Sequence, residues 1–245
     1  LLEVICKRGG IVNKYEPFCV DRDVRGVQNL GGFLREPRDP VRKKERIMKI
    51  FHVDAFTSEP FSGNPAGVCI LSHPKVDEWM RRVAAEMNLS ETAFLIRAAD
   101  GYNLRWFTPL VEVDLCGHGT LASAHILWQE GLAGRDEKIT FHTRSGVLTC
   151  TQEGEWIGLD LPATPDAEIA PPEGIAEALG AVPLYVGASR SDYIIEVDSE
   201  ETVRGLTPDY ARILGMPVRG VIVTSRAAAG EFDFVSRFFA PAVGV

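Results

Sequence analysis

The sequence predicts an α+β fold made of two similar units, and three observations point to it. Candidate helices and strands are mixed without the regular strand–helix–strand alternation of a doubly wound parallel sheet. The stretch NLRWFTPLVEV at 103–113 returns as VSRFFAPAVGV at 235–245, with five identical residues in 11 positions. The Pro-rich stretch ATPDAEIAPPEG at 163–174 has the composition of a linker. The repeat favours a duplicated, pseudo-symmetric fold with its working site between the halves, although five matches alone are also compatible with chance.

Residues 1–47 lack the sustained periodicity of a strand or a helix. They contain two Gly-Gly pairs and end in the charged run RKKER. We interpret this segment as an irregular extension that is not part of the fold. Met48 comes directly before KIFHVDAF, and we interpret it as the natural start. Because the chain begins at Leu1 rather than Met, we interpret the extension as upstream or added sequence.

Regular elements are expected from residue 49 onward. In KIFHVDAF apolar and polar residues alternate as in a half-buried strand. Apolar spacing predicts helices over 75–87 and 120–130, the second ended by Gly131 as a C-cap. Further strands are expected at 66–71, 92–96, 103–109, 138–143, 146–152 and 156–162.

The second unit is expected to hold short helices and further strands. The helices are predicted near 175–180 and 208–214, and the strands at 193–197, 220–225 and 232–239. We therefore divide the folded part into one unit at 48–162 and another at 163–245.

Composition indicates an ordinary soluble globular protein of 245 residues, 45% hydrophobic and 24% charged. No apolar run approaches the length that spans a membrane, and the opening LLEVICKRGG is unlike a signal peptide, so we expect a cytoplasmic protein. The net charge of −8 argues against nucleic acid as a partner. The five cysteines lack CxxC spacing, which predicts neither a disulfide framework nor a zinc site.

The segment DLCGHGT holds the densest group of chemically useful residues. Its glycines allow a tight turn with outward-pointing N–H groups, and the N-terminus of the helix that follows adds about half a positive charge. The amides of Gly117 and Gly119 would then hold a carboxylate or a developing enolate without Lys or Arg. The alternative is a structural turn in which Cys116 fills the core and His118 is a hydrogen-bonded structural residue.

Two side chains elsewhere are further candidates for the site. Glu91, in NLSETAFL, stands where a helix ends and an apolar strand begins, and burial in a cleft would raise its pKa toward the range useful for proton transfer. Asn64, in SGNPAG, is a loop amide that can face a substrate. The alternatives are a rim carboxylate in a turn with Ser90 and an ordinary turn asparagine beside Pro65.

Three ordered motifs carry a family resemblance: FHVDAFTSEPFSGNPAGVCIL, NLSETAFL and RWFTPLVEVDLCGHGTLASAHIL. In this order they resemble the PhzF-like family, which is named after a phenazine-biosynthesis isomerase and shares its fold with diaminopimelate epimerase. The resemblance runs from Met48 to Val245 and is densest between residues 49 and 130. It implies two similar domains, each a sheet wrapped around a central helix, with the site in the cleft between them.

The resemblance also implies roles for individual residues. Glu91 matches the glutamate that acts as general acid and base on a small carboxylated substrate. Gly117 and His118 match residues that hold the substrate and stabilise charge. Cys116 falls where the related epimerases carry one of two opposed catalytic cysteines, and it is our second choice for proton transfer. Asn64 matches a loop position that often faces the substrate.

The remaining expectations concern ligands and partners. The predicted substrate-binding set comprises Asn64, Gly117, Gly119 and Thr120. No cofactor and no metal are expected from the resemblance, and a homodimer is common in the family.

In the family a motif resembling EDPVTGSA follows the second copy of the repeat and brings an aspartate and a Gly-Ser pair into the cleft. The chain stops at Val245 before such a motif. We therefore expect a truncated second domain that leaves the strand VSRFFAPAV at an open edge and makes this half poorly soluble or partly disordered.

These features lead to one main functional hypothesis and two alternatives. The main hypothesis is a cofactor-independent isomerase or epimerase that moves a proton on a small carboxylic acid. The first alternative is a non-catalytic binding protein or an inactive fragment on the same fold. The second is a hydrolase that uses Cys116 and His118, which is weaker because side chains two residues apart at a tight turn need not face each other.

Overall fold

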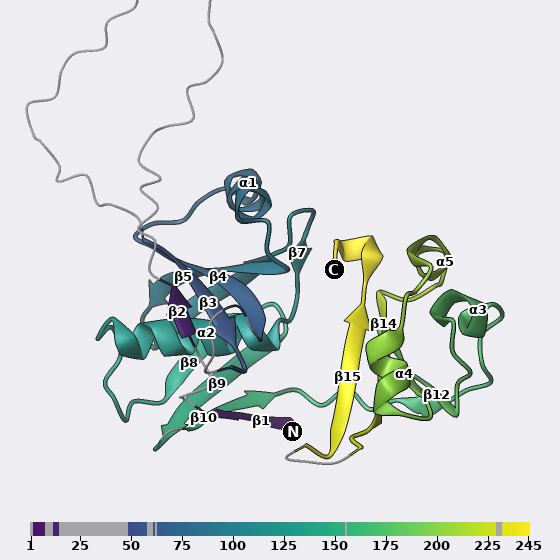
Figure 1. Ribbon diagram of the computed structural model, residues 1–245. Helices are drawn as coiled ribbons and strands as arrows, with labels where there is room; N and C mark the ends of the chain where they lie inside the picture. The colour runs from purple at the N-terminus through teal and green to yellow at the C-terminus, as the bar shows by residue number, and fades with distance from the viewer. Residues whose placement is uncertain are drawn as a thin grey trace, which may run out of the picture.

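The protein is described by a computed structural model (Figure 1) that covers residues 2–7, 12–14, 49–57, 61, 63–154, 156–228 and 232–245. Two sheets organise these residues, and the mixture of strands and helices confirms the expected α+β class. Within the described ranges, every helix falls short of the length and apolar character that crossing a bilayer requires.

The first unit is a ten-stranded sheet in the order β1-β10-β9-β8-β6-β5-β4-β3-β2, with β7 beside β6. Its strands are β1 Leu2–Lys7, β2 Val12–Lys14, β3 Ile50–Ala55, β4 Asn64–Leu71, β5 Glu91–Ala98, β6 Gly101–Phe107, β7 Glu112–Val113, β8 Ile139–Thr143, β9 Gly146–Glu153 and β10 Trp156–Leu161. The pairs β4–β5 and β6–β8 are parallel. Parallel neighbours need a crossover connection, which α1 (Asp77–Met87) and α2 (Gly117–Gln129) supply.

Helix α2 forms the core of the first unit. It packs against β3, β4, β5 and β10, and Figure 1 shows it lying among these strands. Nearly every residue from Gly119 to Trp128 is buried, so the helix is covered on all sides rather than along one stripe. A helix that is apolar all round, as ASAHILW nearly is, is stable only in such a position. The expected central helix of the first unit is thus confirmed.

Helix α1 covers the opposite face of the sheet. Met80 and Ala84 on its inner side join a second cluster with Phe94 and Phe107. Its acidic first turn, Asp77 and Glu78, suits the positive end of the helix dipole. The helix ends at Asn88, which adopts the left-handed conformation with φ of 51°. The sheet of the first unit is therefore covered by helices on both faces.

The N-terminal segment differs in part from the irregular extension that the sequence predicts. Strand β1 pairs antiparallel with β10, and β2 pairs antiparallel with β3, so these two strands form the ends of the first sheet. The backbone hydrogen bonds of the two outermost strands explain the difference, because β10 and β3 would otherwise be open sheet edges. The remainder of 1–47, and Met48, lie outside the described residues.

The second unit is a smaller, five-stranded sheet in the order β11-β12-β13-β14-β15. Its strands are β11 Ala167–Glu168, β12 Tyr185–Ala188, β13 Asp192–Glu196, β14 Gly220–Arg226 and β15 Phe234–Phe239. Its helices are α3 Ile175–Leu179, α4 Glu200–Gly205 and α5 Tyr210–Leu214, followed by the 3-10 turn η2 Pro241–Val243. The core of this unit lies between the helices and one sheet face, and includes Ile195, Val221, Val223 and Phe239.

The repeated stretch forms equivalent strands in the two units. In β6 the guanidinium of Arg105 lies over the ring of Phe107 at 5.1 Å, and in β15 that of Arg237 lies over Phe239 at 4.8 Å. Phe107 is buried beneath α1, and Phe239 is buried beneath the helices of the second unit. The two copies therefore share a local structure as well as a sequence pattern.

Most elements appear where periodicity predicts them, with a few differences. Helix α2 begins at Gly117, three residues before the expected position, because Cys116 already acts as its N-cap. Helix α4 was not expected, although Ser199 precedes it and accepts a hydrogen bond from the Thr202 N–H as an N-cap does. Strands β7, β11 and β12 were also not expected, since they have only two to four residues.

Candidate active site

The candidate site lies at the start of β5, beside the N-terminus of α2. Strands β4 and β5 run parallel with Ala66 opposite Glu91, so both strands begin at the same edge of the sheet. This places Asn64, the first residue of β4, at the edge that carries Glu91. Helix α2 packs against both strands, and its first turn reaches the same edge.

The turn into α2 is held by hydrogen bonds that involve Cys116. The Gly119 N–H donates to Cys116 Sγ at 3.4 Å, and the Thr120 hydroxyl donates to the Cys116 carbonyl at 2.6 Å. Glycine suits position 119, because a Cβ there would lie 3.0 Å from Cys116 Sγ and 3.1 Å from Trp106 Cδ1, closer than most Cβ contacts. The sequence of this turn therefore fixes the position of the thiol.

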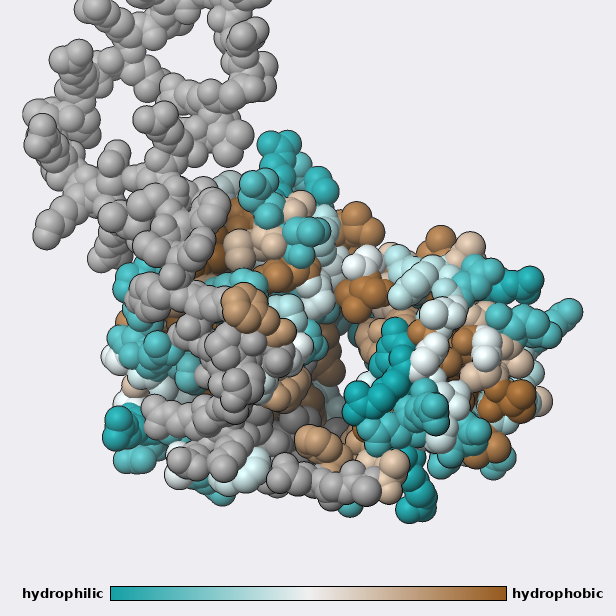
Figure 2. Space-filling model, viewed as in Figure 1, coloured by the Kyte–Doolittle hydropathy of each residue, from teal (hydrophilic) through white to brown (hydrophobic). Residues whose placement is uncertain are grey.

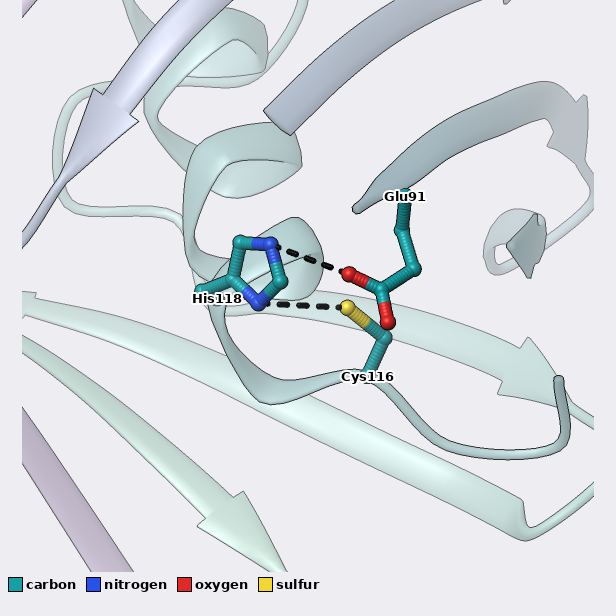
Figure 3. Close-up of side chains that lie close together, drawn as sticks. All are labelled: Glu91, Cys116 and His118. Carbon is teal, nitrogen blue, oxygen red and sulfur yellow. Dashed lines mark hydrogen bonds and ion pairs between the residues drawn. The ribbon is translucent and has the colours of Figure 1, made fainter. Parts of the chain in front are cut away.

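Glu91, Cys116 and His118 form one cluster (Figure 3). His118 Nε2 lies 3.3 Å from Glu91 Oε2, and His118 Nδ1 lies 3.5 Å from Cys116 Sγ. Nε2 also lies 3.2 Å from the hydroxyl of Ser90, which precedes β5. The imidazole thus contacts the carboxylate and the thiol with different nitrogens, and the three groups lie close to one another.

Burial sets the protonation of two of these groups. Desolvation, followed by the negative charge of Glu91, raises the pKa of the Cys116 thiol well above its ordinary value, although the Gly119 N–H opposes this. Desolvation also lowers the pKa of His118, and the Glu91 carboxylate and the Pro65 carbonyl offset only part of that effect. At neutral pH the thiol is therefore protonated and the imidazole is neutral.

These charge states assign the imidazole tautomer. Nε2 faces oxygen acceptors, those of Glu91 and Ser90, whereas Nδ1 faces the protonated thiol of Cys116. We assign the proton of the neutral ring to Nε2, with Nδ1 accepting from Cys116 S–H. In this arrangement His118 presents an N–H toward the carboxylate.

The carboxylate of Glu91 has an oxygen that is buried but makes no hydrogen bond with any described residue. That atom is Oε2, and its distance to His118 Nε2 meets the limit for an ion pair without the geometry of a hydrogen bond. The side chain as a whole is 12% exposed, so the group remains reachable from outside. A buried carboxylate oxygen with spare accepting capacity, beside a neutral N–H group, is suited to take up a proton.

The other predicted binding residues occupy different positions. Asn64 is exposed at the site edge, and Gly117 is half-buried at the first position of α2. Gly119 and Thr120 are buried, and their N–H and hydroxyl groups are engaged with Cys116. The expected anion site built from the amides of Gly117 and Gly119 is therefore altered. The first amides of the helix, at Gly117 and His118, remain the available pair.

The cluster contains the ligand types of a metal site. One ligand atom from each of Glu91, Cys116 and His118 lies within 4.8 Å of the other two. However, the carboxylate and the thiol contact opposite nitrogens of one ring. A single ion binds one imidazole nitrogen, so these contacts describe a hydrogen-bonded relay better than a metal centre.

The structure corrects one expectation about the side chains of Cys116 and His118. Cys116 and His118 do face each other at 3.5 Å, although a spacing of two residues did not predict it. The turn that caps α2 directs both side chains to the same side, as Figure 3 shows. Contact alone does not make a nucleophile, because the raised pKa of Cys116 keeps it as a thiol and a hydrolase needs the thiolate.

Comparison with known proteins places this site in a family. The family model described as PhzC-PhzF, phenazine biosynthesis-like protein, matches residues 53–245. The chain belongs to the PhzC-PhzF family. The matched residues include every member of the cluster.

Other proteins resemble the chain in sequence and in structure. An uncharacterized isomerase of Halalkalibacterium halodurans is 54% identical over 197 residues, which cover 80% of this chain and 74% of the relative. A crystal structure of a PhzF-family phenazine biosynthesis protein from Enterococcus faecalis has a TM-score of 0.71 at 38% identity, and covers 79% of this chain and 73% of that one. A predicted epimerase of Pseudomonas aeruginosa, at 21% identity and a TM-score of 0.56, covers 71% of this chain and 68% of that one. This last likeness shows the shared epimerase-like fold only.

Proposed function

We propose that the protein is an isomerase that moves a proton between carbons of a small carboxylic acid, with Glu91 as general acid and base. The observation that carries this proposal is the buried Oε2 of Glu91, which lacks a hydrogen bond among the described residues and lies 3.3 Å from a neutral imidazole. Family membership and relatives named as isomerases support the reaction class.

The other groups of the cluster have supporting roles in this proposal. Taking a proton from carbon leaves negative charge on the substrate, which nearby N–H groups stabilise. The first amides of α2, at Gly117 and His118, and the partial positive charge of the helix N-terminus supply such stabilisation. Cys116 stays protonated and holds His118 in place, and Thr120 holds the turn. These groups require no cofactor.

Deuterium incorporation tests the proposal. The protein is incubated in heavy water with 2-hydroxy acids, 2-amino acids and cyclic unsaturated carboxylic acids, and the loss of each C–H signal is followed by NMR. At least one acid should exchange, and Glu91→Gln should slow that exchange by about 100-fold or more, as expected for loss of a general base.

Glu86→Gln is the matched control, because Glu86 is an exposed glutamate on α1 and the substitution changes charge in the same way. It should leave the exchange rate unchanged. Equal exchange by the unchanged protein and by Glu91→Gln would contradict the assignment of Glu91.

A further inference from the structure

Arg219 is a charged residue of the second unit that the sequence analysis did not single out. It directly precedes β14, and its backbone N–H donates to the Ser191 carbonyl at 2.8 Å. Its Nε donates to Asp192 Oδ1 at 2.9 Å, and its Nη2 donates to Asp192 Oδ2. Two parallel hydrogen bonds to one carboxylate fix the plane of the guanidinium.

This guanidinium lies on the face of the second sheet that is opposite to α3, α4 and α5. Phe239 points into the core beneath those helices, so its neighbour Phe238 points to the other face. Arg219 lies over the ring of Phe238 at 5.5 Å. The side chain of Arg219 remains 37% exposed, whereas that of Asp192 is 11% exposed.

The same part of the second unit adjoins the first unit. The chain leaves β15 into the turn η2, where Val243 packs against the core of the first unit. Gly244 approaches Leu110, since a Cβ on Gly244 would lie 3.0 Å from a methyl of Leu110. Figure 2 shows an open gap between the two units.

Negative charges of the first unit act on Arg219. The hydrogen bonds to Asp192 raise the pKa of Arg219 most, and the negative charges of Asp192, Asp114 and Glu91 raise it further. Asp114 lies in the segment that leads into α2, and Glu91 is the proposed base. The cation of the second unit is therefore within electrostatic range of both carboxylates of the first unit.

The donors of Arg219 are only partly used. A guanidinium has five N–H donors, and among the described residues its side chain donates only to Asp192. The N–H groups at Nη1 therefore remain available to donate hydrogen bonds to a ligand. A small acid that approaches Glu91 and Asp114 would also be repelled by their negative charges unless a cation held its carboxylate. Planar guanidinium groups match carboxylates better than ammonium groups do.

We propose that Arg219 binds the carboxylate of the substrate and so selects small carboxylic acids, with Asp192 as the residue that positions it. This inference rests on the proposed function, since it names the group that orients the acid whose C–H faces Glu91. The second unit then contributes substrate recognition, and the first unit contributes proton transfer.

The test uses benzoate and its uncharged isostere benzamide as probes of the protein. Binding is measured by NMR titration of protein labelled with ¹⁵N-arginine, and by calorimetry for the variants. Benzoate should shift the Arg219 Nε–H signal, and benzamide should not. Arg219→Gln should weaken benzoate binding by about tenfold or more, the effect of losing a charge-assisted hydrogen bond.

Two further variants separate recognition from folding. Arg219→Lys keeps the positive charge but loses the planar guanidinium that can donate two parallel hydrogen bonds. Its affinity for benzoate should lie between those of the unsubstituted protein and Arg219→Gln. Arg226→Gln makes the same charge change at the exposed far end of β14 and should bind benzoate normally. Thermal melts confirm that each variant is folded.

Equal benzoate affinity in Arg219→Gln and Arg226→Gln would overturn the inference, as would equal binding of benzamide. These outcomes are distinct from failure of the proposed function, because the titration does not need turnover. If Glu91→Gln still exchanges deuterium while Arg219→Gln loses benzoate, the carboxylate site stands and the role of Glu91 does not.

Discussion

Trp106 and Phe238 occupy the same position in the two copies of the repeated strand, yet their surroundings differ. Trp106 is 1% exposed and packs beside Gly119 in the first turn of α2. Phe238 is 38% exposed and lies beside Arg219 on the face opposite the short helices. The two strands have the same residue pattern. The helix that packs on the strand, and not the strand itself, therefore determines whether this aromatic side chain is buried.

The comparison also shows why the proposed base lies in the first unit. In both repeated strands an arginine lies over a phenylalanine on one face of the sheet. The helices that pack on that face contribute buried residues to the hydrophobic core. On the other face of the first sheet, α2 points its N-terminus toward the Glu91 carboxylate. A site for proton transfer needs the helix end as well as the strand.

The largest effect is expected from truncating the two aromatic residues. Trp106→Ala should lower the free energy of unfolding by about 3–5 kcal/mol, because it leaves a cavity against α2. Phe238→Ala should cost less than about 1 kcal/mol, since the side chain is partly exposed. Urea denaturation followed by circular dichroism measures both, and equal losses would contradict the comparison.

A smaller effect is expected from the repeated arginine of the second unit. Arg237 Nη1 donates to the carbonyls of Val203 at 3.2 Å and Leu206 at 2.8 Å, which lie at the end of α4. Arg237→Ala should lower stability by about 1–3 kcal/mol, the range for charged hydrogen bonds with buried acceptors.

The control for this variant is Arg212→Ala. Arg212 is an exposed arginine of α5 that pairs with Asp209 at 3.3 Å, and its loss should cost less than about 0.5 kcal/mol. The same denaturation experiment compares the two. If Arg212→Ala proves as costly as Arg237→Ala, the carbonyl contacts do not stabilise the second unit.

The smallest effect concerns pH and arises in the first unit, which holds all five histidines. Burial lowers the pKa of His118 below its ordinary value of 6.5, so the unfolded chain takes up a proton that the folded protein does not. This part of the stability is present above pH 6.5 and declines as the pH falls, by at most about 1.4 kcal/mol per pH unit. His118→Gln should flatten that decline, and an unchanged slope would contradict the neutral assignment.

Much of this structure could be predicted from the sequence, because it depends on residues that are close together in the chain. Alternating apolar residues predict β3, and the spacing in 75–87 predicts α1 within two residues. Cys116 and His118 stand out because they lie in a glycine-rich turn before a helix, and Glu91 stands out through its place at the start of an apolar strand and the family resemblance. Their contact at the site follows from parallel pairing of β4 with β5, which places the start of β5 beside α2.

What could not be predicted depends on contacts between distant segments. The link of Arg219 to the site requires the relative position of the two units, which no local pattern encodes. The facing of Cys116 and His118 depends on side-chain directions in one turn. Strands β1 and β2 depend on finding open edges at β10 and β3, since their own sequences are short and weakly patterned.

The most direct test of the central claim compares Glu91→Gln with Cys116→Ala in the deuterium exchange of whichever acid the protein uses. The account predicts that Cys116→Ala keeps exchange within about tenfold of the unchanged protein, because a thiol with a raised pKa is not the base. Glu91→Gln should lose about 100-fold or more. Normal exchange by Glu91→Gln together with loss in Cys116→Ala would contradict the account and assign proton transfer to the thiol.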